Sequence, residues 1–189
     1  MNKGYFVHER AWVESDNIGK NTRIWAFTHI MKNVKIGNNC NIGEHCFIEN
    51  GVFIGDDVTI KNGISLWDGI IIENKVFLGP HSVFTNDIRP RSKSYNYTIS
   101  KTIIKEGASI GANATVICGI EIGKYSLIGA GAVITKDVPD YTLVYGNPAK
   151  THGYVCECGR SLNFKNSLVL CECGNKYEKQ NNQVKKGKD

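Results

Sequence analysis

The sequence predicts an all-β fold: a parallel β-helix of about six coils that carries an extruded loop and a small C-terminal module. Three observations predict it. An apolar residue recurs at every sixth position, one irregular segment interrupts this repeat, and four of the seven cysteines lie close together near the end of the 189-residue chain. A helix repeats about every 3.6 residues and an ordinary strand about every two, so a sustained period of six is typical of hexapeptide β-helices instead.

The repeat begins at Ile18 and holds as far as Phe84. Every sixth residue over this range is Ile, Leu or Phe, and a small or β-branched residue follows four positions later. The same period returns at Ile104 and continues to Ile134. Three hexads would form one triangular coil with the apolar side chains inside. Residues eighteen apart would then stack on successive coils at the strand spacing of about 4.8 Å.

The ends of the repeat indicate the domain organisation. Residues 1–17 follow it with a slipped register, as terminal repeats often do, and are predicted to cap the N-terminal end. The repeat stops near Pro139. We therefore predict a β-helix domain at residues 1–150, a zinc-ribbon-like module at 151–180 and a disordered tail at 181–189.

Composition limits the possible environments and partners. The N-terminal residues include charges and no long apolar run, which predicts a chain without a signal peptide or membrane span and a cytoplasmic location. The net charge of +5 is mild and suits anionic small molecules better than nucleic acid. Cys40 and Cys46 occupy the small-residue position of their hexads and are predicted to be buried core thiols.

The interruption at residues 85–103 predicts a loop that projects from the solenoid. Phe84 and Ile104 are twenty residues apart, two more than one coil of eighteen. Long irregular loops in compact domains are usually functional, although a solvated surface loop is the alternative. Basic side chains that suit phosphate groups occur at Arg89, Arg91, Lys93 and Lys101.

Three polar residues are eighteen positions apart beside this loop, namely Asn50, Asp68 and Asn86. They are predicted to form one column on successive coils, which makes them candidates for a binding site. The alternative is that they are corner residues, because Asn and Asp favour tight turns. The spacing alone does not decide between these interpretations.

Two parts of the sequence resemble known enzyme families. The hexads, the external loop and the closing run from Gly129 to Lys150 resemble the left-handed β-helix acyltransferases over about residues 5–155. Within that superfamily, the segment from His45 to Lys93, with its LWDG and FTNDxxPRS elements, resembles enzymes that acetylate the 3-amino group of nucleotide-linked deoxysugars. A left-handed parallel β-helix, a homotrimer and an acetyl-CoA-dependent N-acetyltransferase of lipopolysaccharide or O-antigen sugar biosynthesis are what the resemblance implies.

The resemblance favours a dTDP-3-amino-3,6-dideoxyhexose as the acceptor, with UDP-2-acetamido-3-amino-2,3-dideoxyglucuronate as the alternative. It implies that Asn86 meets the sugar amine and that Asp68 lines the same pocket, which agrees with the column that the spacing predicts and that adds Asn50 as a candidate for substrate binding. Direct attack of the neutral amine on the thioester is expected, with positioning supplying most of the rate. His81 is the best-placed base, although a hydrogen-bonding or packing role stays open, and Asp68 could either take a proton or orient the amine.

The remaining site residues follow from the same resemblance. The diphosphate of the nucleotide would face Arg89 or Arg91. Backbone amides around two alanines of the later coils would hold the pantetheine arm, and two lysines would lie near the phosphates of CoA. These four residues are Ala112, Ala130, Lys136 and Lys150.

Two cysteine pairs predict a metal site in the C-terminal module. One Glu separates Cys156 from Cys158, and one Glu likewise separates Cys171 from Cys173. A Gly follows each pair. This arrangement has the symmetry of a zinc ribbon, although the usual pair has two intervening residues. Four-thiolate structural zinc is predicted, with free thiols or disulfides as the alternatives.

Other functions compete with this interpretation. His45 and His81 are thirty-six residues apart, in register for two coils, which is compatible with a trimeric carbonic-anhydrase-like zinc site. That site requires three protein ligands, and the third histidine is not evident. A hexapeptide O-acetyltransferase and a non-catalytic scaffold are further alternatives. Turnover of acetyl-CoA would separate the transferases from the other two.

Overall fold

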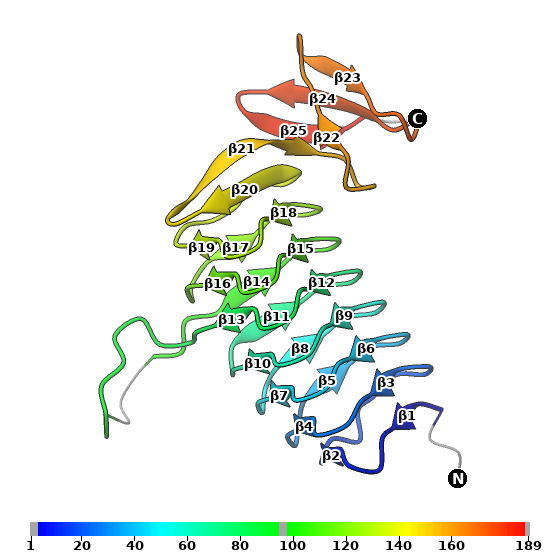
Figure 1. Ribbon diagram of the computed structural model, residues 1–189, viewed down its shortest axis with the longest axis vertical. Helices are drawn as coiled ribbons and strands as arrows, with labels where there is room; N and C mark the ends of the chain where they lie inside the picture. The colour runs from blue at the N-terminus through cyan, green and yellow to red at the C-terminus, as the bar shows by residue number, and fades with distance from the viewer. Residues whose placement is uncertain (1–3, 95–97, 188–189) are drawn as a thin grey trace.

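The computed structural model describes residues 4–94 and 98–187. These residues form twenty-five short strands and no helix, so none of them belongs to a helix that could cross a membrane. The strands stack as successive coils of a parallel solenoid, as Figure 1 shows. The predicted all-β, hexapeptide-repeat fold is therefore confirmed.

The solenoid has three sides. The first is a sheet of eight parallel strands: β1 (Phe6–Val7), β3 (Arg23–Ile24), β6 (Asn41–Ile42), β9 (Thr59–Ile60), β12 (Phe77–Leu78), β15 (Ser109–Ile110), β18 (Leu127–Ile128) and β20 (Thr142–Gly146). The second side comprises β2 (Trp12–Val13), β4 (His29–Ile30), β7 (Phe47–Ile48), β10 (Ser65–Leu66), β13 (Val83–Phe84), β16 (Thr115–Val116) and β19 (Val133–Ile134). The third comprises β5 (Lys35–Ile36), β8 (Phe53–Ile54), β11 (Ile70–Ile72), β14 (Thr102–Ile104) and β17 (Glu121–Ile122).

The apolar residue of each hexad fills the interior. Ile24, Ile42 and Ile60 pair in register on the first side, eighteen residues apart, and all three are fully buried. The small or β-branched residue is buried beside them, as Cys40 and Cys46 illustrate. One narrow hydrophobic core therefore runs the length of the solenoid.

Two-residue turns connect the sides, and we number the three corners by the side that follows them. The first corner joins the third side to the first, the second corner joins the first side to the second, and the third corner joins the second side to the third. The second turn residue has a positive φ, as at Asn39 (57°) and His45 (56°). Asn and His tolerate this left-handed region better than most residues.

The solenoid has about eight turns rather than the predicted six. Val7 pairs with Ile24, seventeen residues away, and Ile128 pairs with Val144, sixteen away. The first and last coils therefore have shorter turns, which shift the hexad register while the apolar side chain still points inward. A strict count of hexads misses both coils.

The chain closes the C-terminal end of the solenoid with antiparallel strands. β21 (Ala149–Val155) pairs with β20 and with β22 (Ser161–Leu162), and it runs across the predicted domain boundary at residue 150. A separate sheet contains β23 (Leu168–Leu170), β24 (Lys176–Gln180) and β25 (Gln183–Lys186). β25 lies in the segment predicted to be a disordered tail. This part of the segment is ordered instead, because Val184 is buried in a second small core.

Candidate functional site

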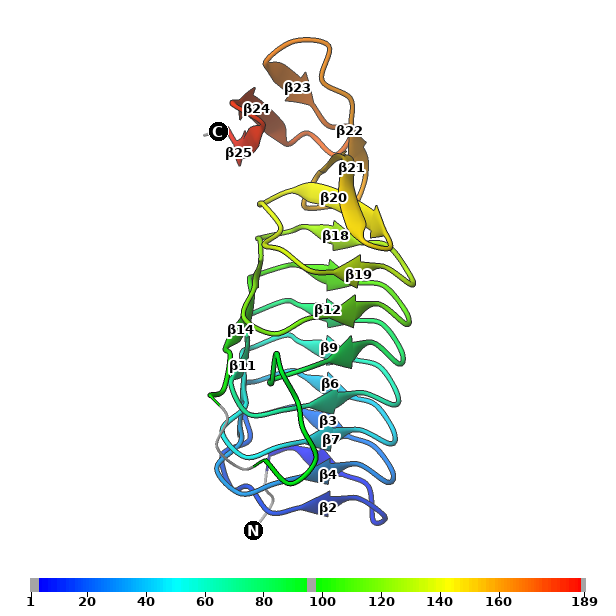
Figure 2. The same cartoon turned by 90° about the vertical axis from the view of Figure 1, so that its left-hand side faces the viewer.

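The extruded loop leaves the solenoid at the third corner, after β13, and projects beside the coils that precede it (Figures 1 and 2). Ile104 pairs with Ile72, thirty-two residues earlier, instead of eighteen. The loop therefore inserts fourteen residues between the second and third sides, and the predicted excess of two residues is wrong. Ile104 lies on the third side, directly after Phe84 on the second side, and does not stack on Phe84 one coil above.

The column predicted from spacing lies at the third corner, where the loop begins. Asn50 is exposed, and Asp68 and Asn86 are half-buried. Gly51 has a φ of +87°, and a Cβ at this position would collide with Oδ1 of Asp68. The Asp68 carboxylate therefore lies over the preceding coil, in space that only glycine leaves open. Glu49 Oε2 accepts a hydrogen bond from the Asp68 N–H at 2.8 Å.

Trp67 of the LWDG element holds the base of this column. Its indole N–H donates to the carbonyl oxygen of Phe84 at 2.9 Å, which links two coils directly below Asn86. The Trp67 ring also lies 5.6 Å from the ring of Phe47 on the second side. Sequence reasoning named the LWDG element but gave Trp67 no role.

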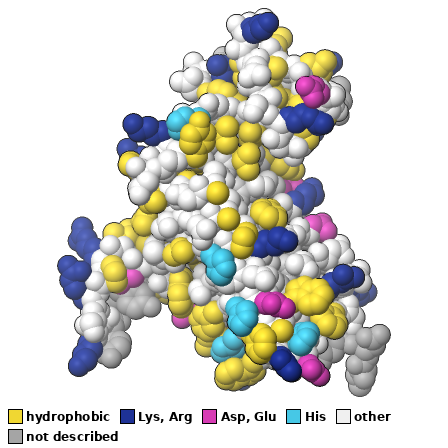
Figure 3. All heavy atoms as spheres, in the orientation of Figure 1, with side chains coloured by type: hydrophobic (Ala, Val, Ile, Leu, Met, Phe, Trp, Pro, Cys, Tyr) yellow, Lys and Arg dark blue, Asp and Glu magenta, His cyan; other side chains and the backbone are white. Residues whose placement is uncertain are grey.

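Both ends of the loop are fastened to the third corner. The Ser100 N–H donates to the Asn86 carbonyl at 3.1 Å, and Ile99 covers Gly69, where a Cβ would collide with it. Asp87 Oδ1 accepts the Arg89 N–H at 2.8 Å. Basic side chains stand out from the loop in Figure 3, and the exposed ones include Arg89, Arg91, Lys93 and Lys101.

Cys118 continues the column above Asn86, a position that the sequence analysis missed. Phe84 pairs with Val116, so residues after the loop stack with a step of thirty-two. The Cys118 N–H donates to Thr85 Oγ1 at 2.9 Å, and its side chain is buried. Counting by eighteen through the loop hides this neighbour, whereas matching Phe84 to Val116 would have found it.

His81 does not join the column. It lies at the second corner, with a φ of +56°, and its imidazole covers Gly63 of the preceding coil. β13 separates it from Asn86 within one chain. His45 lies at the same corner, two coils earlier, where it stacks on Phe27 with ring centroids 4.9 Å apart. Among the described residues, the only group suited to a metal ion is that of the four C-terminal cysteines.

Ala112 and Ala130 also lie at the second corner, in the coils above His81. At an equivalent position lower in the solenoid, the Glu44 N–H donates to Asn62 Oδ1 at 3.2 Å. Alanine offers no such acceptor, and within the described residues neither the Ala112 nor the Ala130 N–H donates a hydrogen bond. The later coils thus present two backbone donors along one corner.

Lys136 and Lys150 come together at the end of the solenoid. Both are exposed and both line a hollow of about 170 Å³ beside Val144. Lys136 follows Cys118 at the third corner, whereas Lys150 belongs to β21. The structure therefore groups the two lysines with each other but places them on a different corner from Ala112 and Ala130.

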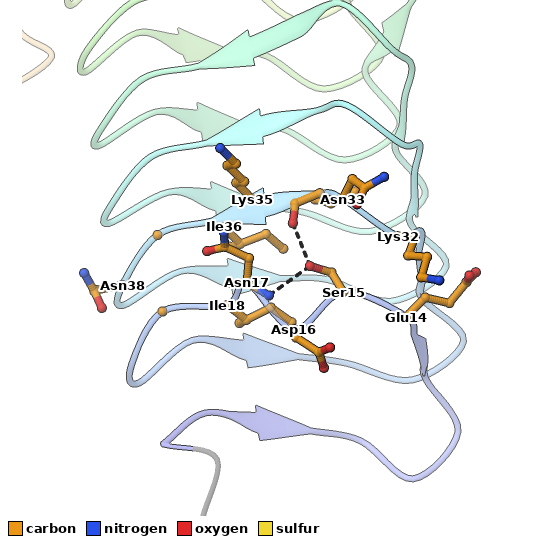
Figure 4. Close-up of a pocket in the computed structure, with 13 residues that line it drawn as sticks. Glu14, Ser15, Asp16, Asn17, Ile18, Lys32, Asn33, Lys35, Ile36 and Asn38 are labelled. Carbon is orange, nitrogen blue, oxygen red and sulfur yellow. Dashed lines mark hydrogen bonds between the residues drawn. The ribbon is translucent and has the colours of Figure 1, made fainter.

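A larger hollow of about 760 Å³ lies at the N-terminal end, where the register slips (Figure 4). Its central hydroxyl is satisfied, because Ser15 donates to the Val34 carbonyl at 2.6 Å and accepts from the Asn17 N–H at 3.1 Å. None of the residues predicted for the site lines it. We assign the hollow to the shortened first coil.

The four C-terminal cysteines lie in two loops of matching backbone geometry. In each loop the N–H of the first cysteine donates to the carbonyl four residues later, and the N–H of the glycine donates back to that cysteine, all at 2.8–2.9 Å. Gly159 and Gly174 have φ values of +85° and +94°, which favour glycine. The backbone N–H of Arg160, followed by Cys156, lowers the pKa of the Cys158 thiol to about 6.

Comparisons with known proteins place this geometry in context. Residues 17–50 and 101–136 match the family model described as bacterial transferase hexapeptide (six repeats). The chain is 57% identical to the dTDP-3-amino-3,6-dideoxy-alpha-D-galactopyranose 3-N-acetyltransferase of Aneurinibacillus thermoaerophilus, over 92% of this chain and 90% of that protein. It is 36% identical to a galactoside O-acetyltransferase of Lactococcus lactis, over 39% of this chain and 40% of that protein.

Solved structures share the fold. The acetyltransferase domain of PglB from Neisseria gonorrhoeae, in complex with acetyl coenzyme A, has a TM-score of 0.57 at 21% identity, covering 79% of this chain and 58% of that one. AntD, an N-acyltransferase from Bacillus cereus in complex with dTDP and 3-hydroxybutyryl-CoA, has a TM-score of 0.57 at 17% identity, covering 82% of each chain. At these identities the likeness concerns the fold alone.

Proposed function

The chain belongs to the hexapeptide-repeat N-acetyltransferases of nucleotide-linked amino sugars, and from this premise we propose that it acetylates the 3-amino group of a dTDP-linked 3-amino-3,6-dideoxyhexose, with acetyl-CoA as donor. The observation that carries the proposal is the 57% identity to a 3-N-acetyltransferase, which extends over 92% of this chain and 90% of the relative. It favours the dTDP-linked acceptor over the UDP-linked glucuronate alternative. The zinc predicted at the cysteines takes no part in the transfer.

We propose the third corner as the acceptor pocket. Asn86 would bind the sugar amine through its amide oxygen, and Asp68, held over Gly51, would orient the same nitrogen. Asn50 would contact the sugar from the coil below. Arg89 and Arg91 of the loop are exposed and would pair with the diphosphate, where guanidinium groups bind well.

The proposed chemistry is direct acyl transfer. The lone pair of the neutral amine attacks the thioester carbonyl, the C–S bond breaks, CoA leaves as the thiol, and the proton lost by nitrogen goes to the departing sulfur. An oriented amine needs little activation, so positioning by Asn86 and Asp68 would supply most of the acceleration. A backbone N–H would stabilise the oxyanion.

We propose the second corner of the later coils as the donor groove. The N–H groups of Ala112 and Ala130 have no acceptor among the described residues and would bind the amide groups of the pantetheine arm. Lys136 and Lys150 share one hollow that lies away from this corner, at the third corner and on β21, so they would lie near the phosphates of a CoA bound in the groove of a neighbouring chain. Acetyl-CoA would then lie along the solenoid axis, with its thioester toward His81.

These two halves lie on different corners, which supports a homotrimer in which one chain supplies the acceptor pocket and its neighbour the donor groove. Two exposed aromatic residues lie in the N-terminal half of this region, Trp12 on the side between the two corners and Phe27 at the second corner. Trp12 is 65% exposed and stacks on His29, with ring centroids 4.1 Å apart. Apolar surface of this kind is typical of a subunit contact. His81 would then act in the site of the neighbouring chain.

The proposal is tested with purified full-length protein by following the N-acetylated product by mass spectrometry. The substrate panel contains dTDP- and UDP-linked 3-amino sugars, with 4-amino sugars as controls. Turnover is expected on the dTDP-linked 3-amino sugar, and Asn86→Ala is expected to lower kcat/KM by about a hundredfold.

Asn62→Ala is the matched control, because Asn62 occupies the equivalent turn position at the second corner of an earlier coil. It is expected to retain activity. If a folded oligomer forms no acetylated product from any sugar of the panel, that result would contradict the proposed function. Equal losses in both variants would instead show that Asn86 acts through corner stability rather than through the sugar.

A further inference from the structure

The four sulfur atoms near the C-terminus converge on one point. All four lie within 4.8 Å of one another, with Cys156 and Cys173 at 3.4 Å and Cys158 and Cys171 at 3.6 Å. A tetrahedral site with Zn–S bonds of about 2.3 Å places its sulfurs about 3.8 Å apart. A disulfide needs a separation of about 2.05 Å. The spacing therefore fits a shared ion better than two sulfur–sulfur bonds.

The surroundings of the sulfurs suit thiolates. Cys156 Sγ accepts from the Cys158 N–H at 3.5 Å and from Asn175 Nδ2 at 3.8 Å, and it lies 3.1 Å from the Tyr177 hydroxyl. The Arg160 guanidinium donates to Cys158 Sγ at 3.6 Å. These donors offset the negative charge of a four-thiolate site and orient its ligands.

From this geometry we propose that the four cysteines bind one Zn²⁺ ion as a closed structural site, and that this ion fastens the cysteine module, residues 156–187, to the end of the solenoid. Four thiolates fill the tetrahedral positions, so none is left open for catalysis. The buried core of the module is small, and domains of this size usually need a metal or disulfides.

A column of tyrosines connects the site to the solenoid. Tyr177, beside Cys156, also accepts the Glu157 N–H at 3.0 Å and packs edge-on against Tyr141, with ring centroids 5.4 Å apart. Tyr141 stacks on Tyr125, at 5.7 Å, at the first corner of the last coils. Loss of the ion would free Cys156 and Tyr177 and so weaken the covering of the last turn.

The first experiment measures the metal content of the full-length protein by plasma mass spectrometry. About one zinc per chain is expected, and exchange with Co²⁺ should give the strong visible bands of tetrahedral cobalt thiolate. Cys158→Ser and Cys173→Ser, at exposed positions, should lose the metal. Cys46→Ser, in the solenoid core, should keep it. Wild-type protein with no bound metal, iron as its only metal, or two disulfides by mass would overturn the zinc site.

The second experiment tests the fastening with hydrogen exchange before and after a zinc chelator. Exchange is expected to accelerate at residues 125–155 and to stay unchanged at 23–60. Tyr177→Phe keeps the ring packing and should keep the zinc, but it should release the ion to the chelator about tenfold faster. Unchanged exchange at residues 125–155 after zinc removal would overturn the fastening while leaving the metal site intact.

Discussion

At the scale of single residues, glycines at the third corner decide where the proposed acceptor groups can lie. Gly51 leaves room for the Asp68 carboxylate, and Gly69 leaves room for Ile99 at the end of the loop. Both glycines have a φ near +90°. The column of Asn50, Asp68 and Asn86 thus depends on neighbours that have no side chain of their own.

Gly51→Ala tests this dependence. The new Cβ would collide with Asp68 Oδ1 and move the carboxylate, so kcat/KM for the acceptor sugar is expected to fall about tenfold or more. The substitution also places a side chain at positive φ, which costs about 1–2 kcal/mol of folding free energy. Steady-state kinetics with both substrates provides the measurement, and KM for acetyl-CoA should change little.

Gly4→Ala is the control that carries the free-energy cost of a side chain at positive φ without the collision with Asp68. Gly4 has a φ of +71°, and a Cβ there would meet only Lys20 at an ordinary distance of 3.7 Å. It should lower thermal stability to a similar extent and leave acceptor kinetics unchanged. Wild-type acceptor kinetics in Gly51→Ala would contradict the placement of Asp68 in the pocket.

At the scale of elements, the extruded loop is an insertion into an otherwise regular coil. The pairs Ile72–Ile104 and Phe84–Val116 both span thirty-two residues, so the strands above and below remain in register around it. Thr102 is buried in the slot of the small or β-branched residue, as position 88 would be in an uninterrupted repeat. The solenoid can therefore close without the loop.

Deleting residues 88–101 should restore the step of eighteen and leave a folded solenoid. Asp87, which suits the left-handed turn position, would then join Thr102 directly. The variant keeps Asn86 but loses Arg89, Arg91 and the cover of Ile99, so turnover of the nucleotide sugar should fall below detection. Circular dichroism and a melting curve check the fold, and the acetylation assay checks the activity.

The double variant Arg89→Ala and Arg91→Ala distinguishes the contribution of the loop's positive charge from that of the cover provided by Ile99. It should raise KM for the sugar nucleotide and leave the melting temperature unchanged, because both side chains are exposed. A deletion variant that folds and retains normal kcat/KM would show that the loop has no part in acceptor binding.

The sequence predicts elements where the hexad is strict and fails where turn lengths change. The apolar period identifies the coils from Ile18 to Phe84 because each inward residue needs only to be apolar and in phase. The first and last coils escape it, since shorter turns shift the phase by one or two residues at Val7 and Val144. The same limit hides Cys118 as the neighbour of Asn86. The register after the loop depends on how many residues the loop inserts, and a count of hexads does not give that number.

At the scale of the whole molecule, the proposed site is divided between two corners of the solenoid. Asn86 lies at the third corner, whereas His81 and the backbone N–H groups of Ala112 and Ala130 lie at the second. Spacing predicted the column that contains Asn86 and the resemblance supplied Ala112 and Ala130, but neither could show that β13 lies between the two corners. A site that uses both groups at once needs two chains, which is why we propose the trimer.

Mixing two inactive variants tests whether each site is shared. Asn86→Ala would disable the acceptor half. Ala130→Pro would remove a donor-half N–H without breaking the turn, because Pro80 already occupies the equivalent turn position two coils below. If neighbouring chains share each site, trimers reassembled from equal amounts of the two should regain about a quarter of wild-type activity, since one site in four combines two intact halves. The same variants assembled separately provide the baseline. Activity that stays at this baseline after verified exchange of subunits would place both halves in one chain and contradict the shared site.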